Sequence, residues 1–572
     1  MKTFLKWLAG VLAVFLLLII AGFFIVTAFL ETEPTVPGKA YLQIDLSGSL
    51  PEYTPQDPLE EMLGKTTFDL RKFRDILEKA AVDERIKAVV LQVGFLETGY
   101  AKLQELRHLI DHFRKSGKPI YAFLGPGVAM TKDYYVASAC DSVFMQPNGN
   151  LFITGVRSEV TFYGDFLRRF GVQAQFIQIG KYKNAPDVYT RGKMSPAHRQ
   201  VLTDLVDQLY RDVVQVIAAS RGLSTKRVQK LIDRQTGFSG KQAVEAGLVD
   251  RVAFYADVIE RLKTRFKKIG SISEVNYARI PASSLKIRNK TRIAVVNCVG
   301  VIAETGEGDV PGIGRVAGAN ALIRDLERVT RSKSIKAIIL RVDSPGGSAT
   351  ASEAIWKAIR NAARKKPVVA SVSDYGASGG YYISMAADTM IAAPNSLVGS
   401  IGIFAGKFSI NGLYDKLDLN SEFVQRGKNA DLFSMLTPWT KSEQRVISSL
   451  IWDFYRDFVQ KVADARGLTY QQVDAIARGH VWTGKEAVDK KLFDNNGYFY
   501  AAVAAAKKMA GIDSSESVRL VYYPRKKSLM REILSAVQIF SRVSSGSFRS
   551  LSSFLKQIQN RPLALMPFRL EF

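Results

Sequence analysis

The stretch GYYISMAADTMIAAPN, from Gly380 to Asn395, has a close counterpart earlier in the chain, DYYVASACDSVFMQPN, from Asp133 to Asn148. Paired segments continue outward from this stretch in the same order. IKAVVLQV returns as IKAIILRV, GKPIYAFL returns as KKPVVASV, and GFSGKQAVEAGLVD returns as VWTGKEAVDKKLFD. Chance does not preserve such an order over so much of a chain, so the sequence is a tandem duplication.

Both copies alternate short β-branched runs with longer amphipathic patterns, which predicts an α/β fold. In the second copy we expect strands at RIAVVNCVGVI, AIILRVD, PVVASVS and TMIAAP, and helices at GANALIRDLERVTRS and ASEAIWKAIRNAARK. We place the first repeat at residues 40–270 and the second at residues 290–524. The copies meet near the polar, weakly patterned stretch from Ser271 to Asn289.

The composition is that of a globular protein with a strongly basic balance. A chain of 572 residues is too long for one ordinary core, so at least two domains are expected. Its net charge of +25 suits an anionic membrane surface or nucleic acid. No zinc spacing, RNP-like aromatic strand or basic heptad region accompanies that charge, so we expect no nucleic-acid partner. The two cysteines, Cys140 and Cys298, are too few for a disulfide framework.

The N-terminus carries the pattern of a retained membrane anchor. Lys2 and Lys6 precede an uncharged run of twenty-four residues, Trp7 to Leu30, which is long enough to cross about 30 Å of hydrocarbon as a helix. A cleaved signal peptide is the alternative, but its apolar core is usually shorter and ends in a small-residue cleavage site. We therefore predict a transmembrane signal anchor at residues 1–31, with the N-terminus in the cytoplasm and the body of the protein outside it.

The last part of the chain, residues 525–572, differs in character from both repeats. Apolar residues recur at helical spacing between Leu529 and Phe540, and basic side chains surround them. Such a basic amphipathic tail can lie on a membrane, or it can pack on a neighbouring domain or subunit. The sequence leaves both alternatives open.

Catalytic chemistry is expected in the second copy. RVDSPGGSATASEAI follows a predicted strand and opens a helix, and its two glycines, Gly346 and Gly347, leave backbone amides uncovered by side chains. Amides in such a turn can form an oxyanion hole. Two serines lie in glycine-rich turns further along, Ser378 in ASGG and Ser400 in VGSIG, and either could be a nucleophile.

The first copy keeps the predicted strands and helices but lacks these groups. GFLETG, residues 94–99, stands opposite DSPGGS without the glycine pair. MTKDYY stands opposite ASGGYY, so that Thr131 faces Ser378, and Ile153 faces Ser400. Serine chemistry is therefore expected in the second copy alone.

None of the four histidines lies near either serine in the sequence, and a lysine can replace histidine as general base. A neutral lysine can take a serine proton when burial lowers its pKa from about 10.4. FIQIGKYKNAPD in the first copy offers Lys181 and Lys183 after a predicted strand, and FVQRGKNA in the second offers Lys428. A cleft between the copies could bury one of them. His480, in GHVWTG, is a further alternative base.

The two copies together resemble signal peptide peptidase A in its long duplicated form, a membrane-anchored serine protease of the Clp-protease and crotonase superfamily. The motifs RVDSPGGSATASE, YGASGGYYISMAAD, NSLVGSIGIF, GKYKNA and GHVWTGKEA carry this resemblance through their order and spacing. It implies that Ser400 is the nucleophile and that Lys183, the second lysine of KYK, is the general base. Ser378 stands where Clp proteases have their nucleophile and is the rival. A site-shaping role is expected for it and for Gly379 and Gly380.

The resemblance also implies a substrate and a setting. It implies an endopeptidase that degrades cleaved signal peptides and other apolar peptides in the membrane, through an acyl-enzyme and with neither metal nor cofactor. It implies a homotetramer whose bowl opens toward the membrane lipid. We expect a single-pass protein of the bacterial inner membrane with its catalytic body in the periplasm; a thylakoid membrane is the alternative.

Two other classes of protein stay open at this point. A crotonase-like acyl-CoA enzyme would use the same oxyanion hole together with a placed carboxylate, for which Glu353 is the nearby candidate. A non-catalytic membrane scaffold would need neither the serines nor the lysine, and the first copy shows that such loss occurs.

Overall fold

The structure is a computed structural model of the chain. It describes residues 34–54, 68–125, 127–285, 291–306, 308–310, 314–525 and 563–565, together with Trp7 and Gly10. The predicted anchor lies outside the described residues apart from those two positions, and the predicted amphipathic tail lies outside them apart from Arg525 and residues 563–565. Within the described part of the chain, no helix is long and apolar enough to cross a membrane.

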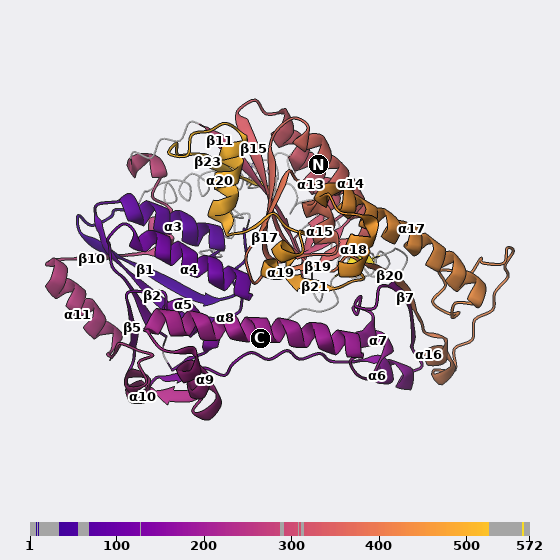
Figure 1. Cartoon of the computed structure of the whole chain (residues 1–572), viewed down its shortest axis with the longest axis horizontal. Helices are drawn as coiled ribbons and strands as arrows, with labels where there is room; N and C mark the ends of the chain where they lie inside the picture. The colour runs from indigo at the N-terminus through magenta and orange to yellow at the C-terminus, as the bar shows by residue number, and fades with distance from the viewer. Residues whose placement is uncertain are drawn as a thin grey trace.

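The first repeat is built on a six-stranded parallel sheet (Figure 1). The strand order is β10 (Gly270–Ser273), β1 (Ala40–Gly48), β2 (Ile86–Leu96), β3 (Ile120–Leu124), β5 (Ser142–Met145) and β9 (Arg251–Val252). Three helices share a hydrophobic cluster with one face of this sheet: α3 (Leu70–Val82), α4 (Tyr100–Arg114) and α5 (Thr131–Ala137). The helix α11 (Tyr255–Phe266) covers the other face. A parallel sheet covered on both faces requires the nearly continuous apolar runs seen in its strands.

The second repeat has the same plan. Its strand order is β21 (Val481–Thr483), β19 (Leu397–Gly399), β17 (Val368–Ala377), β15 (Ile335–Ser344), β11 (Arg292–Val299) and β23 (Arg519–Tyr523). β18 (Thr389–Ala392) also pairs with β17, and β22 (Asn495–Asn496) pairs with β18. One face carries α13 (Ala319–Arg331), α14 (Ala349–Ala363) and α15 (Gly379–Ser384), and the other carries α20 (Phe499–Met509).

The shared order of elements confirms the duplication. The long helices α8 (Pro196–Arg221) and α17 (Lys441–Arg466) have 26 residues each, and both end at a left-handed glycine. The four strands and two helices expected in the second copy are all present. The stretch between the copies holds structure that its weak pattern did not predict, since β10 completes the edge of the first sheet and α12 (Glu274–Ala278) packs beside it.

A third sheet joins the two repeats. Its order is β13 (Gly308–Val310), β14 (Gly314–Gly318), β12 (Val301–Ala303), β16 (Gly346–Ser348), β24 (Leu563–Leu565), β20 (Ile403–Ser409) and β7 (Gln173–Ile179). β7 belongs to the first repeat and pairs antiparallel with β20 of the second along its whole length. In Figure 1, β7 and the short helices α6 (Gly164–Arg169) and α7 (Asp187–Thr190) accordingly lie beside the second repeat. This pairing carries the residues that follow β7 into the second repeat.

Candidate active site

Lys183 of the first repeat lies among oxygen atoms of the second. Its Nζ atom is 2.7 Å from Ser378 Oγ, 3.0 Å from Ser400 Oγ and 3.0 Å from the Ser400 carbonyl oxygen. All three residues are fully buried. The two copies therefore form one cluster that contains the predicted lysine and both candidate serines.

The cluster changes the acid-base character of Lys183. The three oxygens that Lys183 Nζ contacts, two hydroxyls and one carbonyl, are all uncharged. Burial lowers the pKa of Lys183 well below its ordinary value, because the ammonium form loses its hydration. A lysine whose pKa is lowered in this way can be neutral at ordinary pH, and a neutral amine can accept a proton.

A close contact between two turns sets the position of Lys183. Gly180, which follows β7, has φ +103°. The amide of Tyr182 then donates to the carbonyl oxygen of Arg478 in the second repeat. A Cβ on Gly479 would lie 2.4 Å from the backbone nitrogen of Lys183, so this approach of two backbones requires a glycine.

Ser378 lies on a sharp turn between β17 and α15. Its backbone has φ 55° and ψ −112°, which a residue with a side chain rarely adopts. Ser400 also has a positive φ, of 50°, so this backbone strain does not distinguish the two serines. Gly379, the residue after Ser378, packs closely on the glycine pair, because a Cβ there would lie 3.1 Å from both Gly346 Cα and Gly347 N. Ser378 is thus adjacent to the predicted oxyanion hole.

Ser400 lies in the connection between β19 and β20. Its amide donates to the carbonyl oxygen of His480 over 2.7 Å, and the amide of Ser378 donates to the carbonyl oxygen of Gly399 over 2.7 Å. These two bonds hold the serine turns in place around Lys183. The backbone carbonyl and the hydroxyl of Ser400 both contact the lysine, whereas Ser378 offers its hydroxyl alone.

Gly346 and Gly347 form most of the short strand β16. Gly346 has φ +103°, and its amide donates to the Ser344 hydroxyl over 3.2 Å. A Cβ on Gly347 would lie 2.0 Å from the Ile302 carbonyl oxygen, so the approach of β12 requires a glycine here. On its other side β16 pairs antiparallel with β24. The glycine pair therefore lies next to Ser378 and also borders an extended segment of the chain.

The alternative lysines lie elsewhere. Lys181 is exposed, and its Nζ lies 4.7 Å from the centre of the Tyr182 ring. Lys428 is also exposed, in a segment without regular helix or strand. Lys183 is thus the one of these three lysines that contacts the serines.

His480 lies close to the cluster, but its ring is occupied in other ways. The ring stacks on Trp482 with centroids 3.6 Å apart and meets Tyr182 edge-on at 4.5 Å. Its Nδ1 atom lies 2.9 Å from the Val481 carbonyl oxygen. Burial is the main cause that lowers the pKa of His480 to about 4, so the ring is neutral at neutral pH. The backbone carbonyl of His480, rather than its ring, contacts Ser400.

Glu353, the candidate carboxylate for crotonase-like chemistry, is engaged away from the serines. It accepts a hydrogen bond from the Tyr382 hydroxyl and forms an ion pair of 2.7 Å with Lys461. These partners hold it among α14, α15 and α17.

One group near the site carries no sequence signal. Lys102 on α4 forms buried ion pairs with Asp343 and Asp374. The two acids are visible in the sequence, since one precedes SPGG and the other precedes YGASGG. No pattern singles out Lys102, because its partners come from the other repeat.

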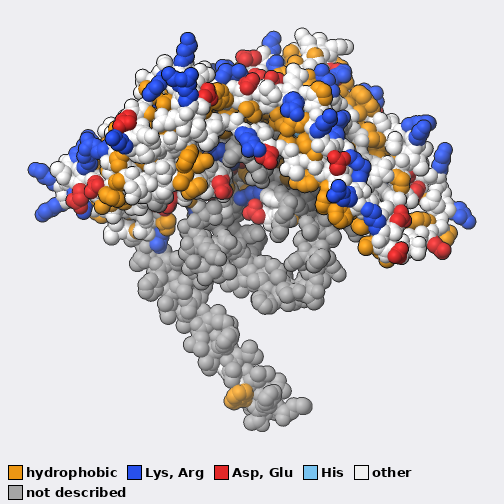
Figure 2. Space-filling view, turned by 90° about the horizontal axis from the view of Figure 1, so that it is seen from below, with side chains coloured by type: hydrophobic (Ala, Val, Ile, Leu, Met, Phe, Trp, Pro, Cys, Tyr) orange, Lys and Arg blue, Asp and Glu red, His pale blue; other side chains and the backbone are white. Residues whose placement is uncertain are grey.

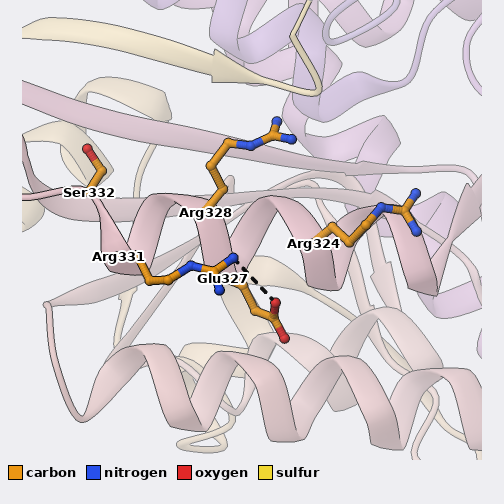
Figure 3. A pocket seen from close by; sticks show the side chains of 5 residues that line it. All are labelled: Arg324, Glu327, Arg328, Arg331 and Ser332. Carbon is orange, nitrogen blue, oxygen red and sulfur yellow. Dashed lines mark ion pairs between the residues drawn. The ribbon is translucent and has the colours of Figure 1, made fainter.

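A hollow on the surface of α13 holds none of the predicted site residues (Figure 3). Arg324, Glu327, Arg328, Arg331 and Ser332 line it, and Arg331 pairs with Glu327 over 3.7 Å. The candidate base and both candidate nucleophiles therefore lie in the buried cluster around Lys183 and not on this open surface.

Comparison with known proteins identifies the family. The model of peptidase family S49 matches residues 112–269 and 360–513, once in each repeat. The chain belongs to peptidase family S49. Both matched regions contribute to the cluster, since the first contains Lys183 and the second contains Ser378 and Ser400.

Three similar proteins align with most of its length. "Serine protease SPPA, chloroplastic" of Arabidopsis thaliana is 33% identical over 466 residues, which are 80% of this chain and 68% of that protein. "Protease 4" of Salmonella typhi is 30% identical over 530 residues, 89% of this chain and 83% of that protein. "Protease 4" of Haemophilus influenzae is 30% identical over 476 residues, 79% and 75% of the two chains. The protein is a serine peptidase of the long duplicated signal peptide peptidase A type.

Proposed function

We propose that this S49 peptidase is a serine endopeptidase with a Ser-Lys dyad whose base is Lys183. The observation that carries the proposal is the buried amino group within 3.0 Å of two serine hydroxyls. A neutral amine has two N–H donors and one lone pair. The Ser400 carbonyl can only accept, so it takes one N–H. Of the two hydroxyls, one accepts the second N–H and the other donates to the lone pair, so a single serine is activated.

The activated serine in this proposal is Ser400, the nucleophile that the resemblance implies. Its carbonyl and its hydroxyl both lie 3.0 Å from Nζ. The carbonyl takes one N–H, the Ser378 hydroxyl at 2.7 Å takes the other, and the lone pair is left to accept the Ser400 proton. Ser378 then holds the lysine, and the glycine that follows it packs on Gly346 and Gly347.

The proposed reaction follows from these contacts. Lys183 Nζ takes the proton of Ser400 as Oγ attacks the peptide carbonyl, and it then gives that proton to the leaving amine nitrogen. Lys183 next takes a proton from the water that attacks the acyl-enzyme, and it returns that proton to Ser400 Oγ as the acid product leaves. Amides of Gly346 and Gly347 are the proposed donors to the oxyanion, with Ser344 releasing the first of them. Each such donor contributes about 2.7–4 kcal/mol in other serine peptidases.

The proposed substrates are cleaved signal peptides and other apolar peptides, bound in extended form. The support is β24, whose sequence is Leu-Ala-Leu and which lies between β16 and β20. Its pairing is antiparallel to both strands. A peptide that adds a strand to a sheet gains backbone hydrogen bonds regardless of its sequence. Apolar positions beside the added strand would then favour apolar side chains in the substrate peptide.

Active-site labelling tests the dyad. A fluorophosphonate should modify the wild-type protein once per chain, and peptide mapping should find the label on Ser400. The Ser378→Ala variant should still be labelled, more slowly, whereas Ser400→Ala and Lys183→Met should not. A label on Ser378 that survives in Ser400→Ala would move the nucleophile to Ser378. Rapid labelling of Lys183→Met would end the dyad proposal.

We also propose that the protein is a single-pass membrane protein with its body in the periplasm, working as a homotetramer. The uncharged run from Trp7 to Leu30 supports the anchor. Figure 2 shows apolar side chains between lysine and arginine side chains on the lower face, a surface suited to lipid or to other subunits. A chain that begins at residue 32 should be recovered without detergent and remain active. Sedimentation of the same protein should give the mass of four chains.

A further inference from the structure

A buried group of three charged residues lies behind the two catalytic turns. Lys102 Nζ is 2.6 Å from Asp343 Oδ2 and 3.4 Å from Asp374 Oδ2. The three side chains are at most 9% exposed. Burial alone would lower the pKa of Lys102, but the two carboxylates outweigh it and hold that pKa above its ordinary value. A charged lysine of the first repeat therefore joins two acids of the second.

Each acid stands at the start of a turn that the proposed reaction uses. Asp343 precedes Ser344, whose hydroxyl bonds the Gly300 carbonyl and accepts from the amide of Gly346. Asp374 lies near the end of β17, four positions before Ser378. A single cation thus contacts both the strand that leads to the oxyanion hole and the strand that leads to Ser378, which holds the proposed base.

The two strands are irregular at this point. Val342 of β15 pairs with Val372 of β17, but Ser344 pairs with Gly376, so β17 bulges opposite Asp343. The Asp343 carboxylate fills this bulge by accepting from the amide of Tyr375 over 3.1 Å. Bulges often re-aim the residues that follow them. The register of the two catalytic turns therefore depends on the Asp343 side chain.

The first repeat holds the bulge from the other side. The amides of Gly99 and Lys102, at the start of α4, both donate to the Asp374 carboxylate over 3.1 Å. A Cβ on Gly99 would lie 2.3 Å from Asp374 Cγ, so the approach requires a glycine. Gly99 ends GFLETG, the segment that stands where the second copy has DSPGGS. This part of the first copy now supports the turns of the second.

We propose that Lys102 is a positioning residue, which sets the spacing between Ser378 and the Gly346–Gly347 pair by holding Asp343 and Asp374 together. The proposal rests on the proposed Ser-Lys peptidase function. It predicts that loss of the Lys102 charge lets β17 and β15 move apart at the bulge. Lys183, which Ser378 holds, and the amides of the hole would then no longer be placed for the same substrate carbonyl.

The test compares Lys102→Met with Lys79→Met. Lys79 is equally buried and donates to the carbonyl oxygens of Tyr277, Ala278 and Ile280 within the first repeat. Both variants should unfold at lower temperature than wild type. Lys102→Met should lower kcat on an apolar peptide ester about tenfold or more while KM changes little, the scale of a catalytic group displaced by about 1 Å. Lys79→Met should keep the wild-type kcat.

Two further variants separate positioning from stability. Lys102→Met/Asp374→Asn removes one charge of each sign, so it should recover unfolding temperature without recovering kcat. Lys102→Arg keeps the charge and should retain more of the kcat than Lys102→Met. A wild-type kcat in folded Lys102→Met, or recovery of kcat in step with stability in the double variant, would overturn the proposal. Failure of the dyad itself would show separately, as activity in Lys183→Met.

Discussion

Lys183 and Ser378 are 195 positions apart in the sequence, yet their Nζ and Oγ atoms lie 2.7 Å apart. The first residue comes from a repeat that has lost its own glycine pair and serines. The second comes from a repeat whose corresponding lysine, Lys428, is exposed. Neither repeat alone contains the proposed dyad, so the site depends on the pairing of β7 with β20.

Replacement of Lys183 by methionine should abolish measurable turnover without lowering stability at neutral pH. General bases contribute about 10²–10⁴-fold to rate. Burial lowers the pKa of Lys183 in the folded protein below the unfolded value of 10.5, so the unfolded chain binds the proton more tightly. The lysine therefore destabilises the fold at pH values below 10.5, and this effect fades as the pH rises toward that value.

Two measurements check this prediction. The wild-type kcat/KM should rise with pH as Lys183 loses its proton. The free energy of unfolding of Lys183→Met should equal or exceed that of wild type at pH 7, with the difference shrinking at higher pH. Lys181→Ala and Lys428→Ala serve as controls and should keep wild-type kcat/KM. A Lys183→Met protein with wild-type turnover, or collapse of Lys428→Ala, would contradict the assignment.

Substitution of Gly379 by alanine should move the Ser378 turn, which holds the base, away from the oxyanion hole. The new Cβ would lie 2.6 Å from Ser352 Oγ and 3.1 Å from Gly347 N, so the turns must shift. Overpacking of this kind typically destabilises by about 1–3 kcal/mol. We expect kcat to fall more than KM rises. The control is Gly94→Ala in the first copy, where the nearest atom is 4.0 Å away and activity should stay unchanged.

Removal of residues 563–572 should raise activity toward short peptides. β24 occupies the space between β16 and β20 that the proposed substrate would take, so it competes with substrate. Steady-state kinetics should show a lower KM in the truncated chain. A synthetic peptide containing Leu-Ala-Leu should inhibit that chain competitively. Equal KM values for the two chains would argue that substrate binds elsewhere.

Replacement of His480 by phenylalanine should leave catalysis intact. The ring contributes stacking with Trp482 and Tyr182, which phenylalanine can reproduce, and the contact to Ser400 comes from the backbone. With a pKa of about 4 the ring does not titrate near neutral pH. The pH profiles of kcat/KM for the variant and the wild type should therefore coincide between pH 6 and 8. A lost or shifted limb would assign the ring a catalytic role.

Much of the fold could be predicted because its signals are local. Repetition of segments revealed the duplication, and β-branched runs marked β11, β15, β17 and β18 correctly. The pairing of β7 with β20 has no such signal, since it depends on the relative placement of two domains. The register of a strand against a distant partner is set by tertiary packing.

The candidate site likewise contains residues that the sequence could predict and residues that it could not. Lys183, Ser378 and Ser400 could be selected from motif chemistry, and the structure brings them together. Residue chemistry alone does not say which serine attacks, because both lie in glycine-rich turns, and the choice of Ser400 comes from the resemblance. Backbone geometry does not separate them either, since both have a positive φ. No sequence pattern predicted a role for Lys102, because that role depends on ion pairs with Asp343 and Asp374 of the other repeat.

Covalent linkage of the two repeats has a kinetic meaning. Were the halves separate polypeptides, each productive site would require a bimolecular encounter and would vanish on dilution. Joined in one polypeptide, they meet at an effective concentration set by the connecting segment, which is millimolar for short flexible connections. Every chain thus carries its own base and nucleophile in a one-to-one ratio, and the complete site forms when that single chain folds.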